Sequence, residues 1–193
     1  MKLRSLVPAL ILSLSTIAHA QVGLYMNPIA IHVTNPQVDT GAFAFLGENS
    51  TSQMFYGVNF GGYYNFHHTK PVDIGFDMRD SIVRHDGASL NSFLVGLRVS
   101  GKPGSFPVKL YVQPMFGSGT SKSEFTTIHK TNFEYSVLAG VDYPLRKHID
   151  FRAIELGYGS VSTVSSANFG GLIPIPAAHL VTISTGFVFY IGH

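Results

Sequence analysis

Apolar and polar side chains alternate with a period of two residues along most of the chain. In the stretch VDIGFDMRDSIV, residues 72–83, Phe76 and Met78 fall on one face of a strand, and Asp77 and Arg79 fall on the other. Such alternation is typical of β-strands with two unlike faces. We expect eight strands, at residues 22–34, 55–66, 72–83, 91–99, 106–117, 133–143, 149–159 and 181–191.

Three of these segments are irregular. The seventh changes phase, which predicts a β-bulge near Arg152 and Ala153. The first contains Pro28 and shows no consistent phase, so it is placed by strand count alone. Pro114 in the fifth removes one ladder donor and is expected near a strand end.

The connections between these segments alternate in length. The gaps at 67–71, 101–105 and 144–148 are short, whereas those at 35–54, 118–131 and 161–178 are long and that at 84–89 is intermediate. An even number of antiparallel strands puts both termini at the end with the short turns. We expect those termini to be periplasmic and the long loops to lie outside the cell.

Strands with one apolar and one polar face fit two kinds of barrel, one surrounded by water and one surrounded by lipid. In a soluble lipocalin-like barrel the apolar face would line the interior, whereas in an outer-membrane barrel it would face lipid. The polar face here is rich in small residues such as Gly57, Gly96 and Ser136, which suit the narrow lumen of eight strands. It also carries charges of both signs, which predict a lumen charge network of Asp73, Asp77, Arg79, Arg98, Lys109, Glu134, Asp142 and Glu155.

Aromatic residues on the apolar face favour the membrane alternative because they gather near strand ends. Two aromatic girdles at the lipid–water interfaces are typical of membrane barrels. The predicted girdle residues are Tyr56, Tyr64, Phe66, Phe106, Phe116, Phe133, Tyr135, Tyr143, Phe151, Tyr158, Phe187 and Phe189. Because lipid offers no partner to an open sheet edge, the eight strands must close on themselves. We therefore predict a closed, antiparallel, up-and-down transmembrane β-barrel.

Residues 1–20 have the pattern of a secretory signal peptide: Lys2 and Arg4, an apolar run, and a small-residue cleavage site at Ala18-His19-Ala20. The barrel domain would then be residues 21–193. The 13 basic residues of the chain include Lys2 and Arg4, so the remainder balances the 11 acidic residues. After residue 20 the chain has no excess of positive charge, and it has no basic patch in its sequence, so nucleic acid is not favoured as a partner. Cysteine is absent, so disulfides do not hold the fold.

With the C-terminal strand TISTGFVFYIGH, these features resemble the eight-stranded outer-membrane β-barrel family typified by OmpA and OmpX, over about residues 22–193. Members usually end in an aromatic-rich strand, with a final Phe, that the barrel-assembly machinery recognises. Phe187 and Phe189 keep that rhythm, and the chain ends in His193. The resemblance implies a bacterial outer-membrane location and contact with outer-membrane lipid and lipopolysaccharide.

The expected function is a monomeric, non-enzymatic structural or surface-exposed barrel, with an external partner bound through the long loops. Apolar groups in those loops, at Phe43, Phe45, Leu46 and residues 172–176, suggest a binding surface, a lid, or hairpins extended beyond the membrane. The alternatives are a narrow pore for small solutes, a lipid-modifying enzyme and a soluble periplasmic binder. The sequence shows no catalytic motif, and no metal or cofactor is expected.

Overall fold

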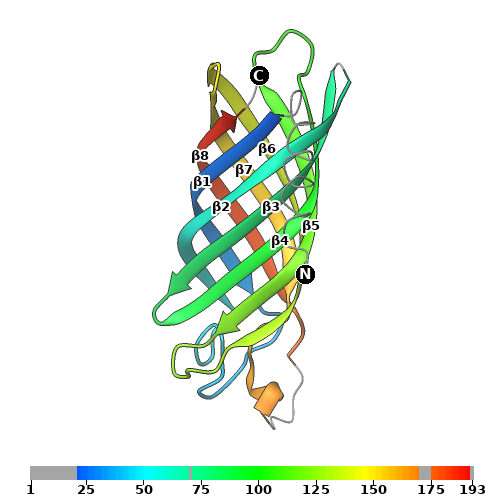
Figure 1. Cartoon of the computed structure of the whole chain (residues 1–193). Helices are drawn as coiled ribbons and strands as arrows, with labels where there is room; N and C mark the ends of the chain where they lie inside the picture. Colours follow the sequence, from blue (N-terminus) through cyan, green and yellow to red (C-terminus); the bar gives the residue numbers. More distant parts are fainter. Residues whose placement is uncertain (1–20, 70, 170–174, 192–193) are drawn as a thin grey trace, which may run out of the picture.

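The computed structural model describes residues 21–69, 71–169 and 175–191. Within them, eight antiparallel strands follow one another in chain order, and the last pairs with the first to close the barrel (Figure 1). The predicted fold class is confirmed. The strands are β1 (Gln21–Thr34), β2 (Ser52–Thr69), β3 (Val72–His85), β4 (Ala88–Gly101), β5 (Lys109–Lys122), β6 (Lys130–Arg146), β7 (Ile149–Val161) and β8 (Ala178–Ile191), with a 3-10 helix η2 (Ser166–Phe169) before β8.

The two ends of the barrel differ in their connections (Figure 1). We call the end with Gln21, Ile191 and the β2–β3, β4–β5 and β6–β7 connections the turn end. The opposite end, with residues 35–51, 86–87, 123–129 and 162–177 between strands, is the loop end. In Figure 1 the turn end lies at the top and the loop end at the bottom. Among the described residues, no helix has the length and hydropathy to cross a membrane.

All seven connections differ in length from the predicted ones. At the loop end, β3 and β4 meet at a tight turn through Asp86 and Gly87, whose φ angles of 41° and 84° are left-handed. The long connection predicted at 118–131 shrinks to 123–129 because β5 and β6 continue past the apolar belt. At the turn end, the connection predicted at 101–105 extends over 102–108, where Pro103 and Pro107 lack ladder donors.

The apolar face points outward and the polar face inward. On β3 the side chain of Phe76 is 59% exposed, whereas Asp77 is 1% exposed. On β4 the same contrast holds between Leu97, which is exposed, and Arg98, which is buried. This arrangement is the one expected for lipid outside and a filled lumen inside.

Strand β1 is regular, contrary to the sequence-based expectation. Tyr25, Asn27 and Ile29 are buried in the barrel, whereas Leu24 and Met26 are exposed on its outside. The alternation of β1 could not be recognised in the sequence, because its inward positions near the loop end are as apolar as its outward ones.

Pro28 and Pro114 lie inside strands, which corrects the expectation that Pro114 is near a strand end. The β4–β5 pairing is interrupted between Gly96 and Val99, opposite Pro114, and the β1–β8 pairing is interrupted around Pro28. Each gap falls where the missing N–H would have pointed. The predicted bulge in β7 is confirmed, since the register shifts between Arg152 and Glu155.

Candidate functional site

The middle of the lumen is filled by six buried charged side chains, which we call the lumen charge network. Three are acidic and three are basic, so their formal charges cancel, and all are 2% exposed or less. They come from β3, β4, β6 and β7, and they are Asp77, Arg79, Arg98, Asp142, Arg152 and Glu155.

Glu155 is the acceptor at the centre of this network. Arg79 donates two hydrogen bonds to it, from Nη1 to Oε1 at 2.8 Å and from Nη2 to Oε2 at 3.0 Å. Tyr111 and Ser184 add hydrogen bonds of 2.7 and 3.1 Å, and Arg152 Nη1 lies 3.3 Å from Oε2. The carboxylate thus has both oxygens satisfied, which a buried charge requires.

Asp142 links the other two arginines of the network. Arg152 donates from Nε at 3.0 Å, and Arg98 donates from Nη2 at 2.8 Å and also reaches Gln113 at 2.9 Å. On the opposite side, Tyr25 donates to Asp77 at 2.7 Å. The lumen is therefore cross-linked from several strands.

Tyrosine rings pack between the guanidinium groups. The Arg98 guanidinium carbon lies 4.3 Å from the centroid of the Tyr63 ring and 3.6 Å from that of Tyr111. That of Arg152 lies 4.6 Å from the Tyr25 ring. Such cation–π contacts fill the space that charges alone would leave open.

A smaller cluster lies between this network and the turn end. Lys109 donates to Asp150 at 2.7 Å, and Tyr190 donates to the same carboxylate at 2.6 Å. Tyr63 joins the cluster through a 2.7 Å hydrogen bond to Tyr190. This arrangement places charge-paired side chains across the turn-end mouth of the lumen.

Three of the eight residues predicted for the network lie outside these six: Lys109 belongs to the smaller cluster, and Asp73 and Glu134 lie apart from both. Asp73 contacts His68 at the rim of the turn end. Glu134 is buried nearer the loop end and accepts a 2.7 Å hydrogen bond from Ser92, with no cation beside it among the described residues. Sequence reasoning missed Asp150 and Arg152, which directly precede the bulge, although the phase before the bulge places both in the lumen.

The loop end of the lumen is closed by apolar side chains, which we call the loop-end plug. Phe45 from the first loop is 1% exposed and stacks on Phe55 of β2, with ring centroids 5.1 Å apart and planes 6° apart. The plug also contains Val164 of the last loop. Its members are Ile29, Ile31, Val33, Phe45, Leu46, Phe55, Val83, Ala88, Leu90, Val161, Val164, Ala178 and Leu180.

Hydrogen bonds between loops cover the plug. Asp39 accepts the backbone N–H of Ser166 at 3.1 Å, and Ser123 donates to the carbonyl of Ala42 at 2.6 Å. Phe45 and Leu46 therefore belong to a lid, one of the three uses considered for the apolar loop groups. Residues 172–174 lie outside the described part of the chain, as do residues 1–20, the predicted signal peptide, and His193.

The predicted girdle residues lie on the outer face, except that Phe106 is in the 102–108 connection and outside any strand. Phe151 is half-buried, and the other eleven are exposed. Phe151 packs near Phe187 at 5.5 Å between ring centroids. At the loop end Tyr158 stacks on His179, with 5.9 Å between ring centroids.

A lipid-modifying enzyme would need a histidine paired with a serine, but several of the barrel's histidines and serines contact other groups. Ser92 and Ser184 bind carboxylates, and Ser136 lies 3.4 Å from the carbonyl of Tyr158. His85 contacts Gln53 and His179 contacts Tyr158. Among the described residues, no cluster of His, Cys, Asp or Glu has the composition of a metal site.

Comparisons with known proteins agree with this fold. No protein-family model matches the chain, and no curated protein matches its sequence significantly. Among solved structures, Neisserial surface protein A (NspA) is similar with a TM-score of 0.56 and 11% identity, over 88% of this chain and 96% of that one.

A second similar structure is Ail, the attachment invasion locus protein of Yersinia pestis. It matches with a TM-score of 0.54 and 9% identity, over 89% of this chain and 99% of that one. Ail in complex with the heparin analogue sucrose octasulfate matches with a TM-score of 0.51 and 10% identity, over the same shares of the two chains. The chain therefore has the fold of the eight-stranded outer-membrane β-barrels.

Proposed function

We propose that the protein is a non-conducting, non-enzymatic barrel of the bacterial outer membrane that presents its loop end to the outside of the cell. The observation that supports this most directly is that two separate groups of side chains fill the lumen at different levels along its axis. The lumen charge network fills the middle, and the loop-end plug fills the part beyond it. A solute would have to break buried ion pairs and separate packed apolar groups, so a pore is disfavoured.

The loop end supplies the surface for an external partner. Phe125 and Ile128, at the tip of the β5–β6 hairpin, are 68% and 41% exposed. They lie between Lys122 and Lys130 in the sequence, so the hairpin tip offers apolar and cationic groups together. A barrel of the same fold, Ail, binds a heparin analogue, which supports external binding without fixing the ligand.

Two measurements test this proposal. In planar lipid bilayers, the purified, folded barrel should give no single-channel conductance steps. In intact cells, a protease should cleave an inserted recognition site at residues 125–128, while a site at residues 103–106 should be cut only after lysis. Conductance steps would favour the narrow pore instead. The reverse protease pattern would show that the loop end does not face the outside of the cell.

A further inference from the structure

A groove lies on the outer face of the barrel where β6, β7 and β8 reach the turn end. It has a volume of about 300 Å³, and it is lined by Leu145, Arg146, Ile149, Phe187 and Phe189. Four of these five side chains are apolar, as expected on a wall that faces lipid. Arg146 is the exception, so the groove combines an apolar surface with a cation.

The strand register places this cation at the end of the groove nearest the turns. Arg146 pairs with Ile149 of β7, and Ile149 pairs with Phe189 of β8. The next outward row, toward the middle of the barrel, contains Phe151 and Phe187. Arg146 therefore lies where a long cationic side chain reaches the lipid–water interface, and the aromatic rings lie on the hydrocarbon side of it.

Arg146 faces outward because β6 is irregular at its end. The register shifts between Pro144 and Arg146, which leaves Leu145 unpaired, and both Leu145 and Arg146 are exposed. Lys147 follows in the β6–β7 turn and is also exposed. No described residue gives either cationic side chain a hydrogen bond or an ion pair. Asp150 of β7 is buried and already accepts hydrogen bonds inside the lumen, so it does not neutralise them.

The apolar surface continues from this groove along β8. A second groove, of about 460 Å³, is lined by residues that include Thr185, Ile183 and Ala153. Thr185 is the next outward residue of β8 after Phe187, so the two grooves follow one another along the strand. The Thr185 hydroxyl donates to the carbonyl of Arg152 at 2.9 Å and is therefore satisfied within the wall. The two grooves together offer a path for one acyl chain that begins beside a cation.

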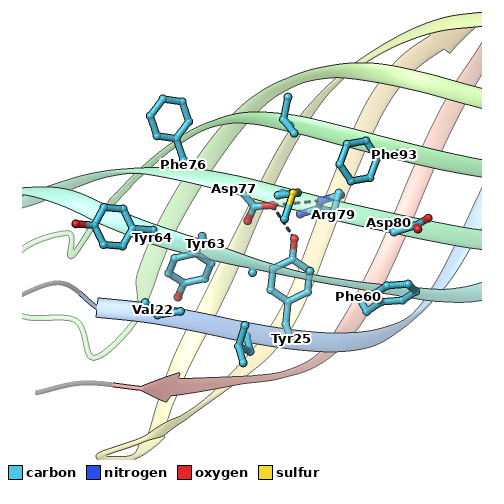
Figure 2. Close-up of a pocket in the computed structure, with 15 residues that line it drawn as sticks. Val22, Tyr25, Phe60, Tyr63, Tyr64, Phe76, Asp77, Arg79, Asp80 and Phe93 are labelled. Carbon is cyan, nitrogen blue, oxygen red and sulfur yellow. Dashed lines mark hydrogen bonds and ion pairs between the residues drawn. The ribbon is translucent and has the colours of Figure 1, made fainter. Parts of the chain in front are cut away.

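The largest outer groove, on the other side of the barrel, carries the opposite charge. It has a volume of about 670 Å³ over β1 to β4, and Figure 2 shows Asp80 on it beside Phe60 and Phe93. The cation among its described lining residues, Arg79, is turned into the lumen. An anionic headgroup would be repelled by Asp80, so charge complementarity favours the wall of β6 to β8 instead.

We propose that this wall binds one anionic glycerophospholipid of the phosphatidylglycerol type. Its phosphate accepts hydrogen bonds from the Arg146 guanidinium group, and Lys147 adds a second positive charge on the water side. One acyl chain runs from Phe189 over Phe187 toward Thr185. Headgroup, phosphate and acyl chain thus follow one another from water to hydrocarbon, as they do in a bilayer. The choice of a phospholipid over lipopolysaccharide rests on the orientation proposed above, in which the turn end contacts the inner leaflet.

Native mass spectrometry of the full barrel in detergent micelles tests the proposal. Phosphatidylglycerol and phosphatidylcholine with identical acyl chains would be compared. Each cation near a membrane surface strengthens binding of an anionic lipid about fivefold, so we expect at least that preference for phosphatidylglycerol. Equal binding of the two lipids would overturn the proposal, as would tighter binding of purified lipopolysaccharide at this site. Both outcomes are independent of the protease pattern that tests the orientation.

Two arginine variants separate this site from general surface charge. Arg146→Gln should reduce the preference for phosphatidylglycerol by about fivefold, because one of the two cations is lost. Arg84→Gln is the matched control, since Arg84 is an exposed arginine at the loop end of β3, on the opposite wall of the ring. It should keep the preference. An unchanged preference in Arg146→Gln, or an equal loss in both variants, would overturn the proposal.

Discussion

Arg79 and Glu155 face each other across the barrel and form a bidentate ion pair, with N–O distances of 2.8 and 3.0 Å. They come from β3 and β7, which lie on opposite sides of the eight-stranded ring. The pair thus connects walls of the barrel that share no backbone hydrogen bonds.

Glu155→Gln should destabilise the barrel by about 3–5 kcal/mol, because Arg79 and Arg152 lose a shared partner and the buried network keeps three arginines but only two carboxylates. Urea unfolding of the barrel in lipid vesicles measures the change. Glu124→Gln, at an exposed loop acid, is the matched control and should change stability by less than about 0.5 kcal/mol. Equal midpoints for the two variants would show that the network does not stabilise the barrel.

The orientation of the side chains can be tested by fluorescence, because the chain contains no tryptophan. Phe76→Trp should be strongly quenched by lipids with brominated acyl chains, since Phe76 faces outward. Phe45→Trp should be little quenched, since that position is in the loop-end plug. Quenching in the opposite order would contradict the lipid-facing assignment.

Phe45→Ala should loosen the first loop, because it removes the ring stacked on Phe55 and leaves a cavity in the plug. We expect a loss of about 3–5 kcal/mol. Limited proteolysis should show faster cleavage within residues 35–51. Phe125→Ala, which truncates an exposed ring of another loop, is the control and should leave that cleavage rate unchanged.

Gly140 and Tyr111 are direct cross-strand neighbours, and the Tyr111 ring lies over the space that a side chain at residue 140 would occupy. Gly140→Ala should therefore cost about 1–3 kcal/mol through overpacking. Combined with Tyr111→Leu, it should cost less than the sum of the single changes, with a coupling of about 0.5–3 kcal/mol. Strictly additive unfolding free energies would show that the ring can move aside.

The fold could be predicted because charges mark one face of most strands. Asp77, Arg79 and Arg98 identify the inward phase, and once it is known the closed ring follows from the needs of backbone groups in lipid. Strand β1 gave no such signal, because Ile29 and Ile31 face an apolar plug and Leu24 and Met26 face outward. Alternation cannot assign the two faces of such a strand, because the apolar plug on the inside and the lipid on the outside both favour apolar residues.

The candidate site was predicted only in part. Alternation shows which residues enter the lumen, but not which of them meet. Glu134 and Asp142 lie on the same face of β6, yet only Asp142 is close to arginines, while Glu134 faces Ser92. Their heights along the barrel and the bulge in β7 decide this, and both depend on strand register.

The loop-end plug also constrains the order of assembly. It brings together Ile31 of the first strand, Leu180 of the last strand and the loops that follow β1 and β7. These groups remain exposed to water until β1 pairs with β8. Closure of the barrel and burial of the plug therefore belong to one late step. A nascent barrel that lacks its final hairpin would expose this apolar interior surface to water.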